Sequence, residues 1–156
     1  MDLILWRHAE AYDAGPGETD MGRELTPKGH KQAKRMAEWL GAQLPEGTRI
    51  LVSPALRTVQ TAEALGRKFK TVEAIAPGCD AEDLLDAANW PHAKEPVLVV
   101  GHQPTLGQVA AVLLSGQPQD WEMKKANAWW LVQRDPDDPY SLYLKAVMAP
   151  DLVAKA

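Results

Sequence analysis

The chain has very little of several features that often decide what a small protein is. Its single cysteine, Cys79, cannot form an intramolecular disulfide, and no cluster of cysteine and histidine suggests a zinc site. Its longest apolar runs are too short to span a membrane, and its first residues become charged too early for a signal peptide. These absences predict a cytoplasmic protein that has no membrane partner and is held together by its core.

Positive charge is also in deficit. The 17 lysine and arginine residues are outnumbered by 21 acidic residues, which gives a net charge of -4. A protein with this balance has no general attraction for nucleic acid, and its tryptophans lack the basic groove that accompanies base stacking. Any anion site must therefore be local. A length of 156 residues predicts one domain that spans residues 1–156.

Short apolar runs alternate with amphipathic stretches along the chain, in the manner of an α/β protein. The predicted helices begin near residues 27, 54, 82 and 105. The predicted strands cover residues 2–6, 50–52, 71–75, 97–100, 128–132 and 141–144. This order predicts a three-layer sandwich, in which a mostly parallel central sheet has helices on both faces and an antiparallel hairpin near the C-terminus. Residues 71–75 are expected to form an edge strand, and the tail from Pro150 is expected to be loosely held.

Two helix starts can be read from their capping residues. Thr26 before Pro27 is a typical N-cap with proline in the first helical position, and Ser53 before Pro54 repeats the pattern. The helix after Pro54 is expected to place its apolar stripe against the sheet. That stripe comprises Val59, Ala62, Leu65 and Phe69.

Two of the predicted strands end in a histidine. The first strand delivers Arg7 and His8 together, and the strand 97–100 runs into Gly101 and His102. Ligands of parallel sheets bind beyond the carboxyl ends of the strands, so both histidines are expected in one crevice. An arginine fork suits phosphate or carboxylate oxygens, and a neutral imidazole can act as a nucleophile or a base. The pattern favours anion chemistry.

A second arginine points to the same crevice. Arg57 falls in the first turn of its helix, where a cation is unfavourable unless an anion is bound nearby. Solvent or a neighbouring acid could also satisfy Arg57. The other histidines, His30 and His92, are expected at the surface.

Carboxylates that follow the strand at 71–75 could supply a proton. Glu82 and Asp80 are the candidates for a general acid, although acidic residues are also common in the first turn of a helix. The loop 11–24 contains Gly-Pro-Gly at 15–17 and is expected to be mobile.

Four segments, in order, resemble the motifs of the histidine phosphatase superfamily. They are Leu5-Trp6-Arg7-His8-Ala9-Glu10, Leu25-Thr26-Pro27-Lys28-Gly29-His30-Lys31-Gln32-Ala33, Ser53-Pro54-Ala55-Leu56-Arg57-Thr58-Val59-Gln60-Thr61-Ala62 and Val100-Gly101-His102-Gln103-Pro104. The short chain and the forms of the first and last motifs are most similar to the small SixA-type phosphohistidine phosphatase branch.

The resemblance implies an enzyme that hydrolyses phosphohistidine in a partner protein. His8 would attack phosphorus and become phosphohistidine, which water would then hydrolyse. Arg7, Arg57 and His102 would bind the three equatorial oxygens as three cations, doing the electrostatic work that magnesium does in kinases, so no metal or other cofactor is expected. Arg23 could also reach the phosphate or the substrate.

The sequence departs from larger superfamily members after its third strand. Those proteins carry a recognisable acidic motif there, which residues 77–82 do not match. Two alternatives therefore stay open. One is a phosphomonoesterase for a small molecule, which would need an acid at Glu82 or Asp80. The other is a non-catalytic module that binds phosphate or a phosphoprotein, although such a module would not need the nucleophile.

Overall fold

The computed structural model describes residues 1–154, and one six-stranded sheet organises them. The order across the sheet is β3-β2-β4-β1-β5-β6, with four parallel strands followed by two antiparallel ones. The strands are β1 (Asp2–Arg7), β2 (Arg49–Val52), β3 (Lys70–Thr71), β4 (Val97–Gly101), β5 (Ala128–Gln133) and β6 (Leu142–Met148). The prediction of a mostly parallel sheet with an antiparallel C-terminal hairpin is confirmed.

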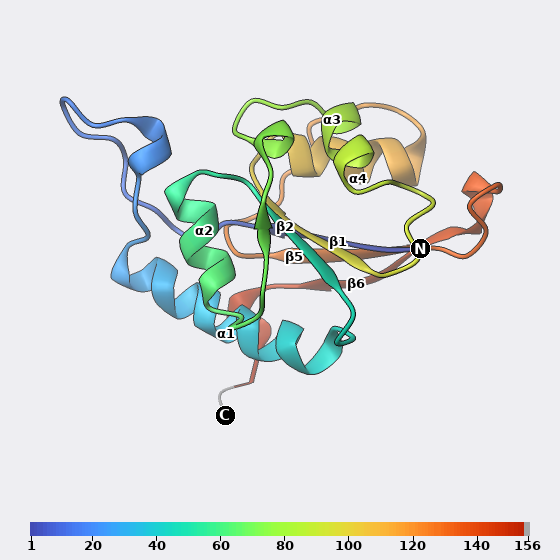
Figure 1. The fold of residues 1–156 in the computed structure, drawn as a ribbon, viewed down its shortest axis with the longest axis horizontal. Coiled ribbons are helices and arrows are strands. Elements are labelled where there is room, and N and C mark those ends of the chain that lie inside the picture. The colour runs from blue at the N-terminus through green and yellow to red at the C-terminus, as the bar shows by residue number, and fades with distance from the viewer. Residues whose placement is uncertain (155–156) are drawn as a thin grey trace.

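Helices cover both faces of this sheet, as the sandwich prediction required (Figure 1). One face carries α1 (Pro27–Gln43) and α2 (Leu56–Glu63), and the other carries α3 (Ala81–Ala87) and α4 (Thr105–Ser115). Side chains alternate along a strand, so Ile4 and Trp6 of β1 pack toward α1 and α2, while Leu3 and Leu5 pack toward α3 and α4. No helix in residues 1–154 is long and apolar enough to cross a membrane.

The start of α1 follows the predicted pattern. The Thr26 side chain accepts a hydrogen bond from the Gly29 amide, with Pro27 at the first helical position. A β-carbon at Gly29 would overlap the carbonyl oxygen of Glu10. This glycine therefore lets α1 lie directly against the chain that follows β1.

Three local predictions were wrong. The strand expected at 71–75 is only the two-residue edge strand β3, and Glu73–Ile75 form a 3-10 helix that buries Ile75. Ser53 does not cap the next helix, because α2 begins at Leu56. That helix ends at Glu63, so Leu65 and Phe69 pack on the core from beyond it.

The tail is also better anchored than expected. Pro150–Leu152 form the 3-10 helix η4, in which Pro150 is buried. Val153 packs on the same core as α1. Pro150 and Val153 therefore hold this part of the tail on the core, and residues 155–156 lie outside the described residues.

Candidate active site

Strand register brings the two predicted histidines together. Arg7 on β1 pairs with Gly101 on the parallel strand β4, so the next residue of each strand, His8 and His102, leaves the sheet at the same place. The His8 amide donates to the Gly101 carbonyl at 3.2 Å, and the two ring centroids lie 5.4 Å apart. The crevice at the carboxyl ends of the strands is therefore built around an imidazole pair.

His8 is buried and neutral, with a fixed tautomer. Only 6% of the residue is exposed, and its Nδ1 lies 2.7 Å from the carbonyl oxygen of Ala9. A carbonyl can only accept, so Nδ1 carries the proton and the lone pair is on Nε2. Burial lowers the pKa of His8 to about 4. The bond to Ala9 opposes this shift, and the positive charges of Arg57, Arg7 and Arg23 reinforce it.

His102 is held by Ser53. The imidazole Nε2 lies 2.7 Å from the Ser53 hydroxyl, and Ser53 is fully buried. The Ser53 oxygen accepts from the Ala55 amide at 3.3 Å, and in residues 1–154 His102 Nε2 is the one bonded partner that can accept the proton of this buried hydroxyl. A neutral His102 then carries its proton on Nδ1. The sequence reading of Ser53 as a helix cap missed this contact, because nothing in the chain order links residues 53 and 102.

Burial, followed by the charge of Arg57, lowers the pKa of His102 to about 3. His102 is therefore a neutral hydrogen-bond donor in the free protein. In the free protein the two arginines are therefore the cations of this set, and a positive charge on His102 beside a bound phosphate stays a prediction.

Arg7 and Arg57 reach the site from different elements. Arg7, at the end of β1, donates from Nη1 to the Met123 carbonyl at 2.8 Å. Arg57, in the first turn of α2, is only 4% exposed. Burial lowers the pKa of both guanidinium groups, yet both remain charged at neutral pH because the ordinary pKa of arginine is very high.

Three buried side-chain nitrogens in residues 1–154 have no hydrogen-bond partner: Arg7 Nε, Arg57 Nε and His102 Nδ1. All three belong to predicted site residues. Unsatisfied buried donors are costly, and their concentration in one crevice indicates a site for an anion that can accept several hydrogen bonds. A tetrahedral oxyanion next to His8 fits this donor set.

The loop before α1 contributes a residue that the sequence did not single out. Asp20 begins the 3-10 helix η1 (Asp20–Gly22) and accepts from Arg57 twice, through its carbonyl at 2.9 Å and its carboxylate at 3.2 Å. Burial alone would raise the pKa of Asp20, but its bonds to Arg23 and Arg57 outweigh burial and lower it. Figure 1 shows this loop in blue, projecting from one end of the molecule.

Arg23 lies in the same loop network. Its Nε donates to the Tyr12 carbonyl at 2.6 Å, and its Nη1 lies 3.2 Å from the Asp20 carboxylate. Its charge also contributes to the lowered pKa of His8. The predicted direct contact of Arg23 with phosphate stays a prediction.

The two candidate acids, Asp80 and Glu82, lie at the start of α3. Asp80 caps α3 and forms a capping box with Asp83, while Glu82 lies exposed in the first helical turn. Within residues 1–154, neither is bonded to a site residue, and no group of three or more His, Cys, Asp or Glu could hold a metal ion. His30 and His92 are exposed, as predicted.

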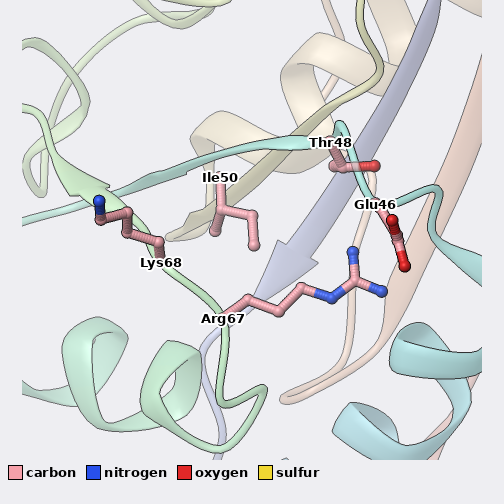
Figure 2. Close-up of a pocket in the computed structure, with 5 residues that line it drawn as sticks. All are labelled: Glu46, Thr48, Ile50, Arg67 and Lys68. Atoms are coloured by element: carbon pink, nitrogen blue, oxygen red, sulfur yellow. The ribbon is translucent and has the colours of Figure 1, made fainter.

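A pocket of about 440 Å³ lies at the opposite end of the sheet, near the start of β2 (Figure 2). Glu46, Thr48, Ile50, Arg67 and Lys68 line it. Arg67 donates to the carbonyls of Gly41, Leu44 and Pro45, which end α1. This pocket is therefore built by a helix-terminating contact and contains none of the predicted site residues.

Comparison with known proteins agrees with this geometry. The model of the histidine phosphatase superfamily (branch 1) matches residues 3–77. Phosphohistidine phosphatase SixA of Escherichia coli K12 is 32% identical over 126 residues, which are 75% of this chain and 76% of that protein. A SixA homologue of Haemophilus influenzae is 30% identical over 128 residues, which are 72% and 77% of the two chains.

A solved structure of the protein histidine phosphatase SixA in complex with tungstate superposes with a TM-score of 0.75. It is 28% identical and covers 97% of this chain and 98% of its own. Together with the paired histidines and the two arginines beside them, these similarities establish that the chain belongs to the histidine phosphatase superfamily and is of the SixA type.

Proposed function

We propose that this protein is a phosphatase that removes the phosphoryl group from phosphohistidine in a partner protein, through a covalent phosphohistidine on His8. The observation that carries the proposal is the set of three unpartnered buried donors around a neutral histidine. A protein histidine phosphatase SixA of similar fold was solved in complex with tungstate, a tetrahedral oxyanion like phosphate, which supports oxyanion binding by a protein of this type.

In the first step, the lone pair on His8 Nε2 attacks phosphorus, and the bond from phosphorus to the substrate imidazole breaks. The substrate nitrogen leaves with the bonding electrons. The Ala9 carbonyl holds the proton on His8 Nδ1 and so keeps Nε2 free for the attack. In the second step, water attacks the same phosphorus, the phosphorus–Nε2 bond breaks, and phosphate and neutral His8 are released.

Arg7, Arg57 and His102 bind the equatorial oxygens in both steps. The two arginines supply positive charge and His102 supplies the Nδ1 proton. These donors are fixed in advance by the Met123 carbonyl, by Asp20 and by Ser53, so they need little reorganisation during transfer. No metal or other cofactor takes part in this scheme.

The positions of the two candidate acids, Asp80 and Glu82, distinguish the candidate substrates. An alkoxide must be protonated as it leaves, whereas an imidazole leaves readily, above all when its other nitrogen carries a proton. Asp80 is engaged in capping α3 and Glu82 is exposed, so the geometry favours phosphohistidine over a small phosphomonoester. A protein substrate follows from this chemistry, and a cytoplasmic location stays a prediction.

The test compares single-turnover hydrolysis of a phosphohistidine protein, an alkyl phosphate and nitrophenyl phosphate. General acid catalysis contributes about 10² to 10⁴ in rate, so the alkyl phosphate should be slower than phosphohistidine by that factor, with the aryl ester between them. Glu82→Gln should change none of the three rates. Equal rates for the alkyl phosphate and phosphohistidine, with selective loss in Glu82→Gln, would instead identify a phosphomonoesterase. No turnover of any substrate would favour the binding module.

A further inference from the structure

A charged groove opens directly from the proposed site. It holds about 520 Å³ between the first turns of α1, the segment 122–127 and η4, and Arg7 forms part of its wall. A second hollow of about 350 Å³ continues it along α1, and the two share Lys28, Gln32, Pro150 and Asp151 as lining residues. The two hollows therefore form one path that leads away from His8.

This groove is basic, although the protein as a whole is acidic. Lys28, Lys31 and Arg35 line it from α1, and Lys124 and Lys125 lie on the other wall. These five residues lie beside Arg7, so the groove carries a local excess of positive charge in a protein whose net charge is -4.

Three acidic residues in the same walls offset only part of this charge. Glu122 pairs with Lys124 at 3.1 Å, and Glu10 accepts from the Thr26 hydroxyl at 2.7 Å. Asp151 is the third. In residues 1–154 no salt bridge engages Lys28, Lys31 or Arg35, and these three cations remain available to a negatively charged partner.

The length of the groove indicates the size of its occupant. Lys28 and Arg35 are seven residues apart on one helix, which corresponds to about 10 Å along its axis. A small phosphate ester bound at Arg7 would leave the α1 cations uncovered. A polypeptide that carries its phosphohistidine into the site would cover them.

We infer that this groove is the docking surface for acidic residues that flank the phosphohistidine of the substrate protein. The inference rests on the proposed function and adds the charge of the substrate to it. In the described residues no aromatic side chain lines either hollow, so the base-stacking contacts of single-stranded nucleic acid are missing and an acidic protein surface fits better. Complementary charge of this kind speeds association and selects partners.

The test uses three probes with the same leaving group: free phosphohistidine, a peptide with phosphohistidine between Asp and Glu residues, and the same peptide with Lys in their place. At low salt the wild-type protein should favour the acidic peptide by about tenfold or more in kcat/KM, mainly through KM. The preference should shrink as salt is raised, because exposed charges are screened.

The informative variant is the triple substitution Lys28→Glu, Lys31→Glu, Arg35→Glu. It should abolish or reverse the preference for the acidic peptide and leave hydrolysis of free phosphohistidine within about twofold, which also shows that the variant is folded. The matched control reverses the charges of Arg49, Lys68 and Lys70, three exposed cations that line a hollow near the starts of β2 and β3, and it should keep the wild-type preference. Figure 2 labels Lys68.

The possible outcomes distinguish the docking surface from the proposed phosphatase activity. Hydrolysis of all three probes with no preference, or the same loss in the control variant, would overturn the docking surface and leave the phosphohistidine phosphatase in place. Failure to hydrolyse any of the three probes would overturn the proposed function. Competition by a 5′-phosphorylated oligonucleotide, but not by the acidic peptide, would assign the groove to nucleic acid.

Discussion

His102 can donate to a phosphate oxygen only from the ring nitrogen that faces the crevice, and Ser53 decides which nitrogen is protonated. The Ser53 hydroxyl donates a hydrogen bond to Nε2 of His102. The ring proton is therefore on Nδ1, the atom that has no partner in residues 1–154. Ser53 is thus a positioning residue. Its contact with His102 joins the end of β2 to the end of β4.

Ser53→Ala should release this constraint. We expect the imidazole of His102 to shift toward the Nε2-protonated tautomer, which the ¹⁵N chemical shifts of its ring will show, and kcat to fall by about ten- to a hundredfold. Ser53→Thr keeps the hydroxyl and should show the wild-type tautomer and the wild-type kcat. An unchanged tautomer together with an unchanged kcat in Ser53→Ala would show that Ser53 does not position His102.

Asp20 presents a carboxylate to the guanidinium that is proposed to bind phosphate. Because both are anions close to Arg57, Asp20 and a bound phosphate repel each other. Asp20→Asn should therefore tighten binding of vanadate or inorganic phosphate by about three- to tenfold, as measured by competitive inhibition. The exposed Asp13, 3.9 Å from Arg23, gives a matched control, and Asp13→Asn should have a smaller effect. Weaker binding in Asp20→Asn would mean that Asp20 mainly orients Arg57.

The location of the two histidines and two arginines could be predicted, because each lies at a strand end or helix start that the sequence pattern marks. His8 and His102 follow apolar strands, Arg7 precedes His8, and Arg57 lies in a first helical turn. Ser53 and Asp20 could not be found in this way, because their roles depend on contacts across 49 and 37 residues. Local patterns do not encode such contacts.

At the level of the elements, the close approach of α1 to the chain after β1 determines how the site is supported. Gly29→Ala places a β-carbon against the Glu10 carbonyl, which also accepts from the Thr26 amide at 3.0 Å. We expect this variant to lower the unfolding free energy by about 1–3 kcal/mol in urea denaturation and to reduce kcat.

Gly41 offers the contrast within the same helix. Nothing lies within 4 Å of a β-carbon at this position, so Gly41→Ala should stabilise the protein by up to about 1 kcal/mol through helix propensity. If the two variants were equally stable, the close approach at Gly29 would not constrain the fold.

Elements with strong apolar patterns were predicted well, and weakly patterned ones were not. The run that forms β4 is buried at every position, which explains its clear signal. The edge strand β3 consists of two exposed residues and has no apolar pattern of its own. The apolar residues that follow it suggest a strand, but Glu73–Ile75 form a 3-10 helix. The anchoring of η4 on α1 is a tertiary contact that sequence pattern does not reveal.

For the whole molecule, two buried neutral histidines make stability depend on pH. Burial lowers the pKa of His8 to about 4 and that of His102 to about 3, whereas an unfolded histidine has a pKa near 6.5. As the pH falls below 6.5, the unfolded chain binds protons that the folded protein does not, and the unfolding free energy decreases.

Between pH 7 and pH 4 the part due to His8 amounts to about 3 kcal/mol. Urea denaturation of His8→Asn over this range should therefore show a smaller loss than wild type. His30→Asn, at an exposed position, should show the wild-type loss. Equal losses in wild type and His8→Asn would show that His8 is not held neutral by the fold.

The central claim, that His8 carries the phosphoryl group, has a direct test. Wild-type protein should be mixed with a phosphohistidine peptide labelled with radioactive phosphorus, stopped with alkali within one turnover, digested and mapped by mass spectrometry. We predict an alkali-stable, acid-labile phosphoryl group on the peptide that contains His8, which appears before free phosphate and is absent in His8→Ala. Release of phosphate with no labelled protein at any time, or the same label in His8→Ala, would contradict the account.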